Sequence, residues 1–212
     1  MKKFLLLCLL LSSASFVDGE EVALSTESRI VLQAALAEFD LKNYDGGLSM
    51  LKELEKKTPD DPFVLNLIGA AYTKKKDFAA ARPYFDHALA KVPNFFPAQF
   101  NLGELIFLER RYPEALEFFR QLLKANPNSE LLQFKVFLCE LQIGNTKGAE
   151  KAMNEIRYPP DTPAWYFARA IWEEKKGNHQ KARELVAGAR FIFGLKTTMF
   201  DDAFQDVGLD LR

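Results

Sequence analysis

The feature that most constrains the fold of this chain is a sequence repeat with a period of 34 residues, in which Pro93-Asn94 recurs as Pro127-Asn128. Alignment of the chain with itself at that offset produces further columns of constant chemical type. These columns are Pro59, Pro93 and Pro127; Tyr44, Phe78 and Tyr112; Gly47, Ala81, Ala115 and Ala149; Leu51, Phe85, Phe119 and Met153; Leu54, Ala88, Leu122 and Ile156; and Gly69 and Gly103. A fixed period of this length indicates stacked copies of one supersecondary unit.

Each unit contains two helical patterns in succession. In the second unit the apolar faces are Leu65, Ile68, Gly69 and Tyr72 on one helix, and Phe78, Ala81, Phe85, Ala88 and Leu89 on the other. Asp61 and Pro62 predict the N-cap and first turn of the first helix, and Lys76 with Asp77 predicts the turn into the second. The recurring prolines stand between units, where a helix must end. The repeated Pro-Asn pair therefore lies between two helical hairpins.

This pattern resembles the tetratricopeptide repeat, whose consensus has small residues on both helices, an aromatic residue at the turn and a closing proline. Residues 62–95 and 96–129 match it best, and residues 28–61 keep Ala35, Tyr44, Gly47 and Pro59. Residues 130–161 have Phe137 where the family has Gly or Ala, so that helix pair must separate or the ring must turn away. Residues 162–194 have the pattern of one further hairpin.

The resemblance implies an all-α fold, a right-handed α-solenoid of antiparallel helix pairs in which neighbouring hairpins bury each other's apolar faces. We divide the chain into residues 1–19, a tetratricopeptide-like domain over residues 20–194, and a C-terminal segment over residues 195–212. The expected units are about 28–61, 62–95, 96–129, 130–161 and 162–194.

The first residues have the pattern of a secretory signal peptide, with Lys2 and Lys3 before an apolar run and then small residues. The apolar segment is shorter than the roughly 20 residues that span a bilayer as a helix. We expect cleavage after Gly19, with Ser15 as the second choice. This predicts an exported protein, periplasmic or secreted, in which Cys139 is the one remaining cysteine.

The concave face of the expected solenoid is the candidate binding site. By the family's geometry, helix A residues that do not serve the hairpin contact line this face, and they are mostly apolar. The candidate peptide-binding residues are Leu36, Phe39, Phe63, Asn66, Phe100, Glu104, Phe107, Phe134 and Leu138. A continuous apolar groove would mark a surface for a peptide or helix of another protein. Each of these phenylalanines alternatively packs between repeats, and the sequence leaves both interpretations open.

The C-terminal segment is a competitor for that groove. Its spacing predicts an amphipathic helix with Phe200, Phe204, Val207 and Leu211 on one face. Such a helix would either cap the last hairpin, which a solenoid needs for solubility, or fold back into the groove.

Other classes of function find little support. The formal charge is −1, without the basic stripe that nucleic-acid binding requires. His87, His179 and Cys139 stand in no metal-ligand spacing, and phosphate loops and nucleophile elbows are missing. We therefore expect neither a catalytic residue nor a metal or other cofactor. The sequence predicts a non-catalytic adaptor or scaffold of the cell envelope that binds a protein partner, with a self-associating structural protein as the alternative.

Overall fold

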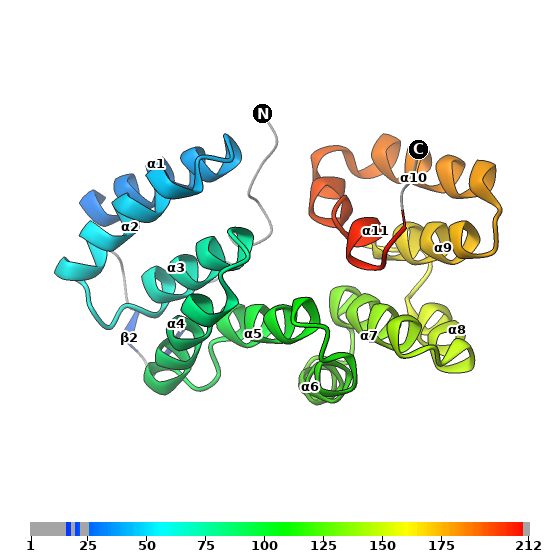
Figure 1. Ribbon diagram of the computed structural model, residues 1–212, viewed down its shortest axis with the longest axis horizontal. Coiled ribbons are helices and arrows are strands. Elements are labelled where there is room, and N and C mark those ends of the chain that lie inside the picture. The colour runs from blue at the N-terminus through cyan, green and yellow to red at the C-terminus, as the bar shows by residue number, and fades with distance from the viewer. Residues whose placement is uncertain (1–15, 18–19, 22–25, 210–212) are drawn as a thin grey trace. The chain divides into compact units, whose positions relative to one another are not determined.

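The computed structural model describes residues 16–17, 20–21 and 26–209 (Figure 1). Most of the predicted signal peptide lies outside these residues. Phe16–Val17 (β1) and Glu20–Glu21 (β2) pair as two short antiparallel strands. The helices that follow are α1 (Thr26–Asp40), α2 (Tyr44–Lys57), α3 (Pro62–Lys74), α4 (Phe78–Lys91), α5 (Phe96–Leu108), α6 (Tyr112–Ala125), α7 (Glu130–Ile143), α8 (Thr146–Glu155), α9 (Ala164–Lys175), α10 (His179–Phe193), the 3-10 helix η1 (Gly194–Phe200) and α11 (Ala203–Asp206).

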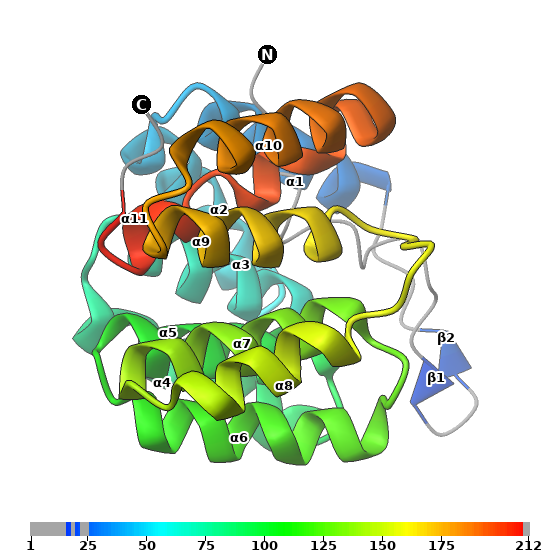
Figure 2. The ribbon, with the colours of Figure 1, turned by 90° about the vertical axis from the view of Figure 1, so that its right-hand side faces the viewer.

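The predicted all-α fold of successive helical hairpins is confirmed. Odd-numbered helices from α1 to α9 begin the hairpins and even-numbered helices complete them. The chain divides into two compact units between Leu105 and Ile106, within α5. Figure 2 faces the second unit and shows α9 and α10 running side by side, with α7 and α8 below them.

The turn inside each hairpin recurs with the period of the sequence. Residues with positive φ follow the first helix of each hairpin, namely Lys42, Lys76, Arg110, Gly144 and Gly177. A left-handed residue of this kind ends a helix by turning the chain out of the helical path. The next residue often caps the second helix. The side chains of Asn43, Asp77 and Asn145 each accept a hydrogen bond of 3.1 Å from the backbone N–H three residues later.

The boundaries between hairpins also repeat. Asp61 caps α3 by accepting hydrogen bonds from the backbone N–H groups of Phe63 and Val64, as predicted. The repeated prolines also form a recurring contact at these boundaries, because the side-chain amide of Gln99 donates a hydrogen bond to the carbonyl of Pro93. An equivalent bond joins Gln133 and Pro127. At each repeated Pro-Asn pair, a hydrogen bond from the next helix therefore holds the loop between two hairpins.

Glycines allow the two helices of a hairpin to approach closely in the first unit. A Cβ placed on Gly69 would lie 2.7 Å from Cε1 of Phe85, so glycine leaves room for this ring. The sequence pairs Gly69 with the small Ala81, but its nearest neighbour is the ring one turn further along α4. At Gly47, a Cβ would lie 2.3 Å from Cε1 of Phe39 and 2.8 Å from the carbonyl oxygen of Ala35.

The hairpin of α7 and α8 departs from this pattern. Phe137 is fully buried, and its ring centroid lies 6.2 Å from that of Phe134 on the same helix. Helix α8 has 10 residues, whereas α6 has 14. At Gly148 a Cβ would lie 2.4 Å from Nδ2 of the capping residue Asn145 and 2.6 Å from a carboxylate oxygen of Glu140, and Gly46 meets its capping residue Asn43 in the same way in the first hairpin. A large residue at the family's small position thus accompanies a shorter second helix.

The sequence analysis did not anticipate a polar contact that joins the first helix to the turn in three of the hairpins. The capping-position asparagine donates from Nδ2 to a glutamate five residues earlier, in the pairs Asn43 with Glu38, Asn145 with Glu140, and Asn178 with Glu173. The hydrogen bond from Asn178, with further bonds from Lys181 and Lys176, holds the pKa of Glu173 below its ordinary value of 4.5, against the opposing effect of burial.

The C-terminal segment does not form the single amphipathic helix that its spacing predicts. It folds as η1 and the one-turn helix α11, separated by Asp201 and Asp202. Phe200 and Phe204 are both buried, as their apolar spacing suggests. The segment therefore packs as an irregular strap against the second unit.

We predict opposite effects for two glycine-to-alanine changes. Gly47→Ala should lower the free energy of unfolding by roughly 1–3 kcal/mol, because the backbone at Ala35 blocks the new methyl group. The matched control is Gly188→Ala in α10, where the nearest atom would be 3.7 Å away. It should raise stability by about 0.5–1 kcal/mol through reduced chain entropy. Urea unfolding followed by circular dichroism measures both, and equal stability of the two variants would contradict the packing described for Gly47.

We also predict a pH-dependent contribution from Glu173. Because its pKa is lowered on folding, its charge stabilises the protein above the ordinary carboxyl pKa, and this stabilisation is lost as pH falls through the lowered value. Glu173→Gln should therefore cost about 1 kcal/mol at neutral pH and little in strong acid. Thermal melts over a pH series test this, with the exposed Glu184→Gln as control. A cost that does not change with pH would show that the charge plays no part.

Candidate peptide-binding surfaces

The structure buries most of the predicted groove residues. Six side chains are 4% exposed or less, namely Phe39, Asn66, Phe100, Phe107, Phe134 and Leu138. Leu36, Phe63 and Glu104 are partly exposed. The predicted set therefore separates into an accessible group and a buried layer.

In α1, the two predicted residues play different parts. Phe39 lies against Gly47 of α2, and its ring centroid is 6.2 Å from that of Tyr44. It belongs to the contact within the hairpin. Leu36 is partly exposed and packs at the edge of the core that α1, α2 and α3 share. Leu36 is thus the accessible apolar group of this helix.

In α3, both predicted residues have partners within the first unit. The Nδ2 group of Asn101 donates a hydrogen bond of 2.8 Å to Oδ1 of Asn66, and both side chains are buried. This bond joins α3 to α5. The ring of Phe63 meets that of Phe95 edge to face at 4.9 Å. The two asparagine side chains therefore use at least one hydrogen-bonding group each in this contact.

Helix α5 carries three predicted residues. Phe100 lies 6.2 Å from Phe96 between ring centroids, and Phe107 lies 5.2 Å from Tyr112. Both rings are buried, whereas Glu104 between them is partly exposed. Glu104 is therefore the charged residue of the accessible group.

In the second unit, the C-terminal segment packs against the first helices of the hairpins. The ring of Phe200 meets Phe134 of α7 at 5.1 Å and Phe167 of α9 at 5.2 Å between centroids. Phe204 approaches Phe167 at 6.2 Å. Contacts of both kinds considered for this segment are present: those with Phe167 correspond to capping of the last hairpin, and that with Phe134 corresponds to folding back onto a predicted groove residue.

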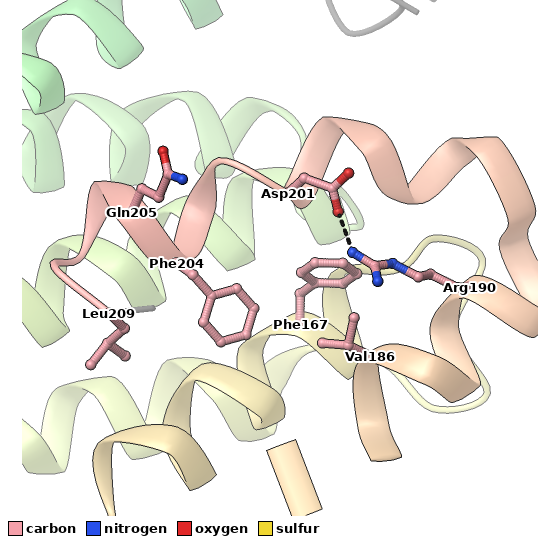
Figure 3. Close-up of a pocket in the computed structure, with 7 residues that line it drawn as sticks. All are labelled: Phe167, Val186, Arg190, Asp201, Phe204, Gln205 and Leu209. Atoms are coloured by element: carbon pink, nitrogen blue, oxygen red, sulfur yellow. Dashed lines mark hydrogen bonds and ion pairs between the residues drawn. The ribbon is translucent and has the colours of Figure 1, made fainter. Parts of the chain in front are cut away.

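A pocket of about 160 Å³ remains between this segment and the last hairpin (Figure 3). Its apolar lining consists of Phe167, Val186, Phe204 and Leu209, and its polar lining of Arg190, Asp201 and Gln205. Arg190 reaches from α10 to Asp201, with 3.2 Å between Nη2 and Oδ1. The pocket thus has a mixed lining, which includes apolar side chains and the ion pair of Arg190 and Asp201.

The titratable residues considered in the sequence lie apart from one another. His87 faces Asp60 at 3.1 Å and His179 faces Glu174 at 2.7 Å, both near the surface, and Cys139 is fully buried. Over residues 26–209, His, Cys, Asp and Glu form no cluster of three or more suited to a metal ion. In the same part of the chain, helices with the length and apolar character needed to cross a bilayer are absent.

Sequence analysis missed two surfaces. It did not anticipate the pocket, because its walls come from α9, α10 and the irregular C-terminal segment. It also missed an exposed apolar group near the end of α10, formed by Phe191, Ile192 and Leu195. The run of apolar residues from 191 to 193 is longer than a half-buried helix face requires, and this was a readable signal.

Comparisons with known proteins agree with the repeat architecture. A sequence model of the tetratricopeptide repeat matches residues 32–94 and 74–130. A search of curated proteins found no match.

Solved structures share the fold at low sequence identity. A tetratricopeptide repeat protein of Thermus thermophilus is 19% identical with a TM-score of 0.68, and the alignment covers 85% of this chain and 98% of that one. One from Parabacteroides merdae is 16% identical with a TM-score of 0.72, covering 85% and 70%. MamA from Desulfovibrio magneticus is 20% identical with a TM-score of 0.58, covering 79% and 95%. Similarity at these identities shows the fold alone.

Proteins built from this repeat generally mediate protein–protein interaction. The 34-residue period, the repeated turns and the match over residues 32–130 agree with one another. Residues 32–130 of this chain therefore consist of tetratricopeptide repeats.

Proposed function

We propose that this protein is an exported, non-catalytic adaptor that binds a helix or peptide of a partner protein on the first helices of its hairpins. The observation that carries the proposal is a difference between the units. In the second unit Phe134 of α7 lies under the chain's own Phe200. In the first unit Leu36 and Phe63 remain partly exposed, and Glu104 of α5 is partly exposed as well. We assign ligand contact to these three residues.

The buried residues of the predicted set would shape this surface from beneath. Phe39, Asn66 and Phe100 fix the positions of α1, α3 and α5 through contacts inside the first unit. Since Asn66 and Asn101 bond to each other, they have less capacity to hold the backbone of an extended peptide. A helix satisfies its own backbone and binds through apolar side chains, so we favour a helical ligand.

Site-specific photo-crosslinking tests the surface. A photoreactive amino acid at residue 36 or residue 104 should give the same crosslinked partner in cells, because both positions face the ligand. The matched control is residue 41, where Leu41 is 76% exposed at the end of α1. Residue 41 should give no adduct with that partner. Crosslinking of the partner at residue 41 but at neither test position would refute the assignment.

Export rests on the pattern of residues 1–19 and is tested separately. Mass spectrometry of the protein recovered outside the cytoplasm should find a mature chain beginning at Glu20, or at Phe16 for the second cleavage choice. Replacing Leu6 with Arg should interrupt the apolar run and leave the uncleaved precursor in the cytoplasm. An intact Met1 on exported protein, or unchanged export of the variant, would contradict a cleaved signal peptide.

A further inference from the structure

Phe191 is the most exposed large apolar side chain in the described part of the chain, at 92%. It lies on α10, opposite the face that packs on α9 through Ala182, Val186 and Ala189. The residues one turn before it are small, since Ala187 is exposed and Gly188 is partly exposed. The ring therefore projects from a low surface that a partner can approach closely. Full hydration of a phenyl ring forgoes the free energy that its burial would provide.

The pocket of Figure 3 has the size to receive one aromatic ring, and four of its seven lining residues are apolar. Its volume is about 160 Å³, close to the roughly 150 Å³ of a cavity that binds benzene, but its lining is mixed because Arg190, Asp201 and Gln205 contribute to it. Phe167 and Phe204 offer aromatic walls, and Val186 and Leu209 offer aliphatic ones. The pocket is too small for most cofactors and drug-sized ligands, which need roughly 300 Å³ or more.

We propose that Phe191 of one copy of this protein inserts into this pocket of a second copy. Among the polar residues, Glu184 is exposed on the Phe191 side of α10, and the pocket is lined by Arg190 together with its ion-pair partner Asp201, so the charges of this lining cancel. Ile192 and Leu195 are 57% and 55% exposed and would extend the apolar contact. This interaction is independent of the peptide surface proposed for the first unit.

The geometry of α10 predicts the form of the assembly. Successive helical residues are separated by about 100° around the axis, so Phe191 points roughly 120° away from the midpoint of Val186 and Arg190, which line the pocket. The projecting ring and the pocket therefore face different neighbours. A contact of this kind is heterologous and produces rings or open chains instead of a two-fold dimer.

The association should be weak and should depend on protein concentration. Complete burial of one phenyl ring removes about 150–250 Å² from water, well below the roughly 800 Å² per partner of a stable interface. Ile192 and Leu195 add to this area without making it large. We therefore expect reversible growth in mass as concentration rises.

Complementation between two variants is the decisive experiment. Phe191→Asp removes the ring and leaves the pocket intact, whereas Gln205→Trp fills the pocket from an exposed position and leaves the ring intact. In sedimentation velocity, each variant alone should stay monomeric at concentrations where the unaltered protein associates. Their mixture should form a one-to-one heterodimer and nothing larger, because only one contact remains.

A matched control and a second measurement keep the result interpretable. Ile143→Asp replaces another exposed apolar residue, 41% exposed on α7, and should associate like the unaltered protein. Circular dichroism confirms that each variant is folded. Mixing Ile192→Cys, which keeps the Phe191 ring, with Gln205→Cys under oxidising conditions should give a disulfide between copies that joins residues 192 and 205, and Cys139 is buried and out of reach.

Several results would overturn the proposal. One is an unaltered protein that remains monomeric at every concentration. Another is a folded Phe191→Asp or Gln205→Trp variant that still associates. A mixture of the two variants that stays monomeric, together with cysteine variants that fail to form the 192–205 crosslink, would also exclude insertion of Phe191 into the pocket.

Discussion

The structure depends on how closely the two helices of each hairpin can approach. Where glycine stands on one helix, as at Gly69 and Gly47, an aromatic ring occupies the space that a side chain would need. The phenylalanine is then buried inside the hairpin, and the apolar area it loses to water stabilises the pair. In the hairpin of α7 and α8, Phe137 takes the small position and is fully buried, and α8 is short. The dimensions of each hairpin therefore follow from the size of a few side chains.

This packing also decides which residues remain available for binding. Most of the aromatic residues that the family's geometry assigns to a groove are buried against a glycine or another ring, although Phe63 stays partly exposed beside Phe95. Phe39, Phe100 and Phe107 find such partners in Gly47, Phe96 and Tyr112. The accessible groups on the same helices are fewer and less aromatic, and the proposed function assigns recognition of a partner to them.

The first helices of the hairpins are covered differently in the two units. In the second unit the chain supplies its own covering, because Phe200 contacts both α7 and α9. That covering is incomplete, since a pocket remains beside Phe204 while Phe191 stands in water on the other side of α10. The C-terminal segment therefore leaves two features of the last hairpin uncovered, namely the pocket and the exposed ring of Phe191.

The sequence by itself determined the period, the hairpins, the N-cap at Asp61, the turn at Lys76 and Asp77, and the resemblance to the tetratricopeptide repeat, because these depend on residue types at fixed local spacing. Only the tertiary structure decided that the Asn66 and Asn101 side chains bond to each other, that Phe200 covers Phe134, and that Phe191 is exposed. The same apolar spacing serves a core face and a binding face equally well. Which of the two a side chain joins depends on partners that are distant in the chain, and a periodic pattern carries no information about them.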